Sequence, residues 1–222
     1  MRNVPVVEGK VALSDIAWNK VMDQLASRGW ARLVRAVAPH ALEALEQAAP
    51  GPWSSLPETE GSAGVRQAGL AHHSAVDEAA GVVQSMADGI RAGIDGVESP
   101  GVAPLPTFNH AEWCRAETGQ KFITPHRDPD TAGGVIAVLT IRGRAVFRIW
   151  DLDGSLADAQ SHPELATSWE SEDGDLVLMR GGGWPLPTSK CPIHEAESPR
   201  EGDRVTLTLR HNKGGYGADY FS

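Results

Sequence analysis

The chain is poor in the features that mark secreted and membrane proteins. It has only two cysteines, Cys114 and Cys191, too few for a disulfide framework, and neither stands in a Cys-x-x-Cys pair. It has no apolar run of the length a membrane span needs, about 18 residues, and its opening, MRNVPVVEGKVALSD, lacks the apolar stretch and cleavage site of a secretory signal. We therefore expect a cytoplasmic protein with no membrane partner.

Positive charge is also scarce. The chain has 20 Lys and Arg against 29 Asp and Glu, a formal net charge of -9. It thus lacks the broad positive field with which most nucleic-acid binders attract phosphate. Nucleic acid is disfavoured as a partner, although a basic strip around Arg142, Arg144 and Arg148 keeps it as an alternative.

The 222 residues, 41% of them hydrophobic, suffice for one domain with a sizeable core. Residues 1–100 are expected to form a helical N-terminal layer. Apolar residues at helical spacing predict helices in DIAWNKVMDQLAS, capped by Ser14, in PHALEALEQAA, and in the long segment that begins at Ser74, with Ser74 as its cap. WARLVRAV is short enough for a strand, and Gly51 to Gly69 has the composition of a loop.

The pattern changes to extended structure in residues 101–222. The runs GVIAVLTI, AVFRIW, DLVLM and RVTLTLR are rich in Val, Ile, Leu and Phe and are separated by turn signals. The predicted fold is α+β but mainly β: a single domain over 1–222, in which N-terminal helices pack on one sheet of a double-stranded β-helix (jelly roll).

A His-x-Asp pair in FITPHRDPD is the first candidate metal site. In extended backbone His126 and Asp128 project to the same face, and two histidines with one carboxylate on one face are typical of iron(II) oxygenases. His194 is the preferred third ligand, because a late strand of a jelly roll can return beside an early one. His162 and His211 are weaker candidates, Cys191 with His194 is too small a set for zinc, and Asp130 is expected to belong to a turn.

A strand with two arginines is the second signal. Arg204 and Arg210 have an even spacing, with Thr206 and Thr208 between them, so all four share one face. Two such arginines can bind a small dicarboxylate through charge-assisted hydrogen bonds. A solvated strand face would show the same alternation.

Together, PHRD, HEAESP and RVTLTLR resemble the iron(II) and 2-oxoglutarate-dependent oxygenases, with details similar to the AlkB-like branch, from about Phe108 to Arg210. The resemblance implies iron ligands His126, Asp128 and His194, with O2 as a further cosubstrate. It also implies that Arg204 binds the distal carboxylate of 2-oxoglutarate and that Arg210 lies near its keto-acid end. Thr206 stands where the family has Asn, and the family's Asn-x-Tyr pair is missing.

The expected function is a non-haem dioxygenase that oxidises a C–H bond of a small molecule such as an amino acid or a natural-product intermediate. Two alternatives are oxidative N-demethylation of nucleic acid and a cupin-like metal- or small-molecule-binding module without oxygenase activity. Trp184, in the Gly-rich segment before His194, is expected either at the substrate entrance or in packing. Phe147 and Trp150 are expected in sheet packing, and no signal indicates an oligomeric state.

Overall fold

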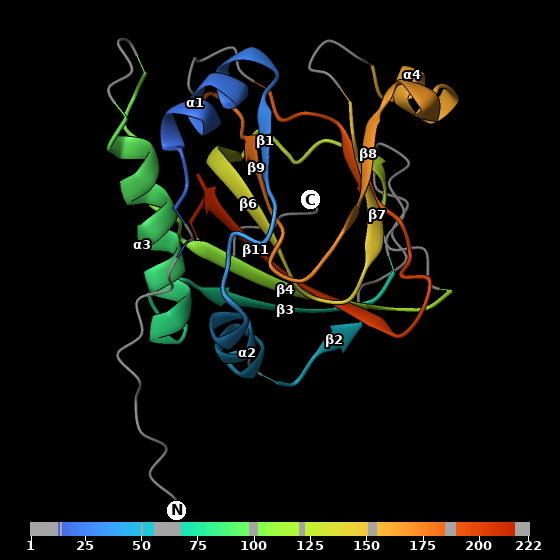
Figure 1. Ribbon diagram of the computed structural model, residues 1–222, viewed down its shortest axis with the longest axis horizontal. Helices are drawn as coiled ribbons and strands as arrows, with labels where there is room; N and C mark the ends of the chain where they lie inside the picture. Colours follow the sequence, from blue (N-terminus) through green and yellow to red (C-terminus); the bar gives the residue numbers. More distant parts are fainter. Residues whose placement is uncertain are drawn as a thin grey trace, which may run out of the picture.

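Two antiparallel sheets face each other, with helices on the outside of the larger one (Figure 1). This computed structural model describes residues 13, 15–49, 51–55, 68–97, 102–119, 123–150, 155–184 and 190–215. The predicted helical cap Ser14 and most of the predicted loop Gly51 to Gly69 lie outside these residues.

The larger sheet has seven strands in the order β1-β9-β6-β11-β4-β3-β2. The predicted apolar runs form its centre, where β11 pairs with β6 on one side and with β4 on the other. In chain order its strands are β1 (Trp30–Leu33), β2 (Ser54–Ser55), β3 (Leu70–Ala75), β4 (His110–Glu117), β6 (Ala132–Arg142), β9 (Leu176–Arg180) and β11 (Asp203–Asn212).

The smaller sheet has four strands in the order β5-β10-β7-β8. They are β5 (Ile123–His126), β7 (Ala145–Ile149), β8 (Thr167–Ser171) and β10 (His194–Ala196). A short helix α4 (Leu156–Ser161) and a 3-10 turn (Pro163–Leu165) connect β7 to β8. The mainly β jelly-roll prediction is confirmed.

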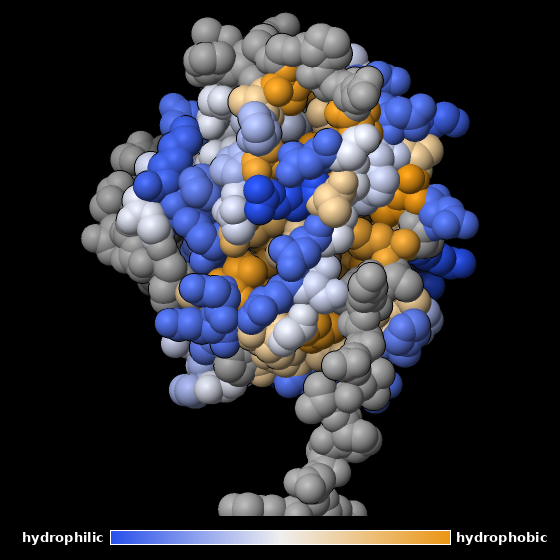
Figure 2. Space-filling view, turned by 90° about the vertical axis from the view of Figure 1, so that its left-hand side faces the viewer, coloured by the Kyte–Doolittle hydropathy of each residue, from blue (hydrophilic) through white to orange (hydrophobic). Residues whose placement is uncertain are grey.

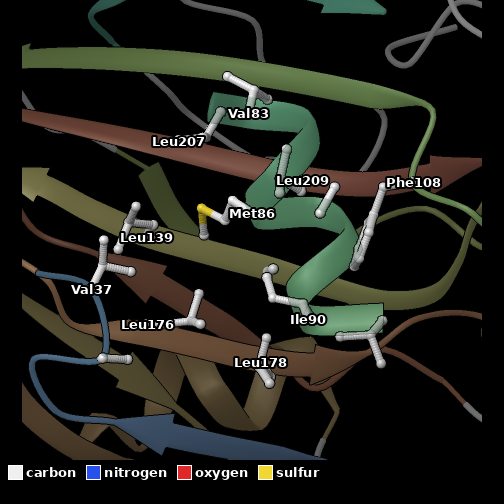
Figure 3. Packing of buried hydrophobic residues seen from close by; sticks show 14 of the residues in the cluster. Val37, Val83, Met86, Ile90, Phe108, Leu139, Leu176, Leu178, Leu207 and Leu209 are labelled. Atoms are coloured by element: carbon white, nitrogen blue, oxygen red, sulfur yellow. The ribbon is translucent and has the colours of Figure 1, made fainter. Parts of the chain in front are cut away.

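The helices cover the outer face of the larger sheet. They are α1 (Trp18–Ser27), α2 (Pro39–Gln47) and α3 (Gly81–Asp95). Figure 3 shows Met86 and Ile90 of α3 directed at Leu207, Leu209 and other leucines of the sheet, and all of these residues are buried in one cluster. Burial of these apolar side chains attaches the helical layer to the sheet.

A second apolar cluster fills the space between the sheets. It includes Phe147 from β7 and Met179 from β9. Trp30 on the edge strand β1 stacks on Trp169 on the edge strand β8, with ring centroids 5.5 Å apart, and this pair joins the two sheets along one side. Phe147 is therefore a packing residue, as predicted, and Trp150 packs with Ile193 in a smaller cluster.

The N-terminal part differs from the prediction in two respects. Ser74 is not a helical cap, because it lies in β3, and the helix begins seven residues later at Gly81. The reason is pairing: residues 70–75 form a ladder with β4, and this long-range pairing overrides the local tendency of Ser74 to cap a helix. The first hundred residues also supply three strands of the larger sheet, β1, β2 and β3, and are not only helical.

The surface on the α3 side carries both hydrophilic and hydrophobic residues. Figure 2 shows hydrophilic residues over much of this face, with hydrophobic residues in separate patches between them. Patches of this kind are ordinary on globular proteins. In the described part of the chain, no helix is long and apolar enough to span a membrane.

Candidate metal centre

The side chains of His126, Asp128 and His194 meet beside the paired strands β5 and β10 of the smaller sheet. His126 ends β5, and its backbone pairs directly with His194 at the start of β10. Asp128 follows two residues after His126. One ligand atom from each of the three residues lies within 4.8 Å of the others. The strand pairing therefore brings together the three residues that were predicted as ligands.

Hydrogen bonds set the tautomer of both histidines. Nδ1 of His126 lies 2.9 Å from the carbonyl oxygen of Thr124, and Nδ1 of His194 lies 3.1 Å from that of Pro192. A carbonyl oxygen can only accept, so each ring carries its proton on Nδ1, and Nε2 remains available to a metal.

The donor set fits a cation. Nε2 of His194 faces Oδ2 of Asp128 at 3.5 Å, so two atoms with free electron pairs are directed at a common space that suits a metal ion. Burial, and then the neighbouring His194, lower the pKa of His126 to about 4, so its ring is neutral at pH 7 and can act as a ligand. Two imidazoles and one carboxylate suit iron(II).

Both predicted arginines are buried inside the double sheet. Arg204 is 2% exposed and Arg210 is 4% exposed, so the solvated-face alternative does not hold. The opposite face of β11, with Leu207 and Leu209, packs against the helices. The alternation along β11 therefore separates an inner polar face from an outer apolar face.

One arginine touches the triad itself. Nη1 of Arg210 lies 3.4 Å from Oδ1 of Asp128. Arg204, at the other end of β11, donates to Oγ1 of Thr140 at 3.1 Å, and Thr206 is buried between the two. Burial lowers the pKa of Arg204 to about 10, still high enough for a positive charge at pH 7 that an incoming carboxylate would stabilise.

Comparison with known proteins gives a clear result for structure alone. No family model matches the sequence, and no curated protein matches it. A prolyl-4-hydroxylase from Pseudomonas putida has a similar structure, with a TM-score of 0.58 and 19% identity over 88% of this chain and 98% of the hydroxylase.

Two other solved structures are also similar. The non-haem α-ketoglutarate-dependent epimerase SnoN from nogalamycin biosynthesis has a TM-score of 0.57 and 12% identity over 87% of this chain and 82% of SnoN. The protein OsALKBH1 has a TM-score of 0.52 and 14% identity over 83% of this chain and 98% of the OsALKBH1 chain.

The chain has the fold of the 2-oxoglutarate and iron(II) oxygenases.

In this oxygenase fold, backbone contacts hold the loop that carries Asp128. Arg127 donates to the carbonyl oxygen of Cys191 at 2.5 Å and so joins the first two candidate ligands to the segment before the third. Lys213 donates to the carbonyl oxygens of Asp130 and Gly182. A Cβ at Gly182 would lie 2.8 Å from the carbonyl oxygen of Asp130, so this approach requires glycine.

Other candidate residues lie away from the centre. His162 pairs with Glu164 at the surface, and His211 contacts the carbonyl oxygen of Thr107. The Cys191 thiol lies 3.8 Å from Asp128 but does not belong to the group of ligand atoms. Trp184 is buried in the helix-side cluster, and its indole nitrogen donates to the carbonyl oxygen of Ala103 at 3.0 Å, which favours packing over the substrate entrance.

The sequence reasoning missed a polar cluster beside Arg210. The Glu112 carboxylate on β4 accepts from Nη2 of Arg210. Nε2 of His73 on β3 lies 3.9 Å from Oε1 of Glu112, and Nδ1 of His73 lies 3.1 Å from Nε2 of His110. A signal was present in HAEWCRAE, where His110, Glu112 and Cys114 alternate with apolar residues and so indicate a polar inner face.

The buried ring of His110 predicts a loss of stability in acid. Burial, followed by the charge of Arg210, lowers its pKa from 6.5 to about 3. Between these values the unfolded chain binds a proton that the folded chain does not. The free energy of unfolding should therefore fall as the pH drops from 6.5 toward 3, with up to about 1.4 kcal/mol per pH unit from this residue.

Urea unfolding at a series of pH values tests this prediction in wild type and His110→Gln. His110→Gln should flatten the pH dependence of the free energy of unfolding. Equal slopes in wild type and His110→Gln would contradict the assignment.

Proposed function

We propose that this protein is a non-haem iron(II) and 2-oxoglutarate-dependent dioxygenase that oxidises a C–H bond of a small molecule. The observation that carries the proposal is the arrangement of the His126, Asp128 and His194 triad beside a strand with two buried arginines, one of which contacts Asp128. A cupin-like binding module has no need for two desolvated cations beside its metal.

Each residue then has a defined task. His126, Asp128 and His194 would hold iron(II) through two imidazole nitrogens and one carboxylate oxygen. Iron(II) with 2-oxoglutarate would supply the oxygen chemistry, in which the cosubstrate is converted to succinate and CO2.

The arginines bind the cosubstrate. Arg204 pairs with its distal carboxylate by charge-assisted hydrogen bonds, and Arg210 lies at its keto-acid end. Thr206, buried between them, lines the same inner face of β11. The apolar cluster between the sheets reaches the site through Phe147, whose ring stacks on His194 at 5.9 Å between centroids, and would limit water on that side.

A small-molecule substrate is favoured over nucleic acid because the three arginines of the predicted basic strip are paired with acidic residues. Each of these arginines forms ion pairs: Arg142 with Glu46 and Asp203, Arg144 with Glu172, and Arg148 with Glu195 and Glu197. Charges paired in this way add little attraction for phosphate. Salt-sensitive binding of single-stranded DNA or RNA in a filter assay would instead favour N-demethylation.

Anaerobic titration tests the proposed function directly. We expect a visible charge-transfer absorption band that requires both iron(II) and 2-oxoglutarate. With succinate in place of 2-oxoglutarate the band should be absent, since succinate lacks the keto group. A wild-type protein that binds iron(II) but gives no band with 2-oxoglutarate would be a metal-binding module, and the proposal would fail.

A further inference from the structure

Three neighbouring strands carry a polar cluster on the inner face of the larger sheet. Glu112 on β4 is opposite His73 on β3 and Thr208 on β11, and the next inner position along β4, His110, is opposite Arg210. Because side chains alternate along strands, Glu112 and Arg210 lie on the same face. They are diagonal neighbours there, within reach of each other.

One guanidinium connects two carboxylates in this cluster. Nη2 of Arg210 pairs with Glu112, and Nη1 of the same group faces Asp128. All three side chains are buried, at 5% exposure for Arg210 and 10% for each acid. A guanidinium held through both of its outer nitrogens has a fixed plane.

Arg210, and not the neighbouring histidines, supplies the positive charge that balances the Glu112 carboxylate. Burial is the largest cause that lowers the pKa of both His73 and His110, so both rings are neutral at pH 7. A buried carboxylate is costly unless a charge or hydrogen bonds stabilise it. Glu112 therefore belongs beside Arg210 for reasons of charge as well as of geometry.

We propose that Glu112 is a positioning residue for cosubstrate binding, because it holds the Arg210 guanidinium in the orientation that faces the keto-acid end of 2-oxoglutarate. The inference rests on the proposed function. Glu112 acts through the hydrogen bond that its oxygen accepts, so an amide oxygen at the same place can replace it. Without that bond, Arg210 can turn toward Asp128 alone.

The test compares Glu112→Ala with Glu112→Gln. The dissociation constant for 2-oxoglutarate is measured anaerobically from the iron(II) absorption band, and binding of Mn(II) alone is measured by electron paramagnetic resonance. Glu112→Ala should weaken 2-oxoglutarate binding at least about tenfold, because it removes a buried charge-assisted hydrogen bond to Arg210, with Mn(II) binding little changed. Glu112→Gln should restore binding to within about threefold of wild type, because it keeps the oxygen acceptor.

Glu195→Ala is the matched control. Glu195 is a similarly buried acid that pairs with an arginine, Arg148, but its neighbour on the strand is His194, so its side chain points to the other face of the smaller sheet. This control should leave 2-oxoglutarate binding unchanged. Equal weakening by Glu112→Ala and Glu195→Ala, or none by Glu112→Ala, would overturn the inference.

Two further outcomes are separable. If Glu112→Ala does not fold, Glu112→Asp serves as the second variant. It withdraws the carboxylate by one methylene and should still weaken 2-oxoglutarate binding. Wild-type affinity for 2-oxoglutarate in Glu112→Asp would count against the inference. Absence of the band in the wild-type protein would defeat the proposed function. A normal wild-type band with unaltered Glu112 variants would defeat this inference alone.

Discussion

Replacement of Asp128 with alanine is expected to abolish iron-dependent conversion of 2-oxoglutarate to succinate. Loss of residues that only support a metal ligand already lowers metal affinity by about 10- to 100-fold, so loss of the ligand itself should exceed about 100-fold. Removal of Asp128 also removes an acidic partner of Arg210. Succinate formation, with Mn(II) binding as a second measurement, reports the effect.

The segment offers its own control in Asp130. This residue is exposed, lies in the turn after Asp128, and contributes its backbone oxygen to Lys213. Asp130→Ala keeps that backbone contact, so succinate formation should remain close to wild type. An Asp128→Ala protein that still forms succinate at the rate of Asp130→Ala would remove Asp128 from the metal centre.

Replacement of Arg204 with methionine is expected to raise the 2-oxoglutarate requirement by about 100-fold, because truncation of one partner in a buried charge pair costs about 2–5 kcal/mol. Methionine replaces the aliphatic part of the arginine side chain without its charge, and Arg204 is already desolvated in the fold, so the folded state should survive. At saturating 2-oxoglutarate the turnover rate should change much less than the requirement does.

Arg200→Met supplies the comparison for this second variant. Arg200 is exposed in the turn before β11, so its loss removes the same charge from the chain without a change inside the double sheet. Its 2-oxoglutarate dependence should match wild type. Equal dependence in Arg204→Met and wild type would show that the distal carboxylate binds elsewhere.

Local sequence patterns were enough for several features of the site. RVTLTLR alternates every second residue, and this alone predicts that Arg204 and Arg210 share a face, because side chains of a strand alternate. The pair His126 and Asp128 follows in the same way from extended backbone. The apolar runs likewise predicted the strands β6, β7, β9 and β11.

Features that depend on pairing could not be predicted in this way. Ser74 precedes an amphipathic run and has the character of a cap, yet its strand pairs with β4. Glu112 stands far from Arg210 in the chain, and only the pairing of β4 with β11 places the two side by side. Trp184 was assigned two possible places, and the packing of the helical layer favours one of them.

The sequence by itself determined which faces of the strands are polar and which residue types are available to bind a metal, because both follow from chain-local periodicity and side-chain chemistry. Only the tertiary structure decided that His194, and not His162 or His211, lies with His126 and Asp128. It also decided that the face with Arg204 and Arg210 is buried rather than solvated. Both depend on how strands distant in the chain pair and stack, and long-range burial, not local preference, selects that arrangement.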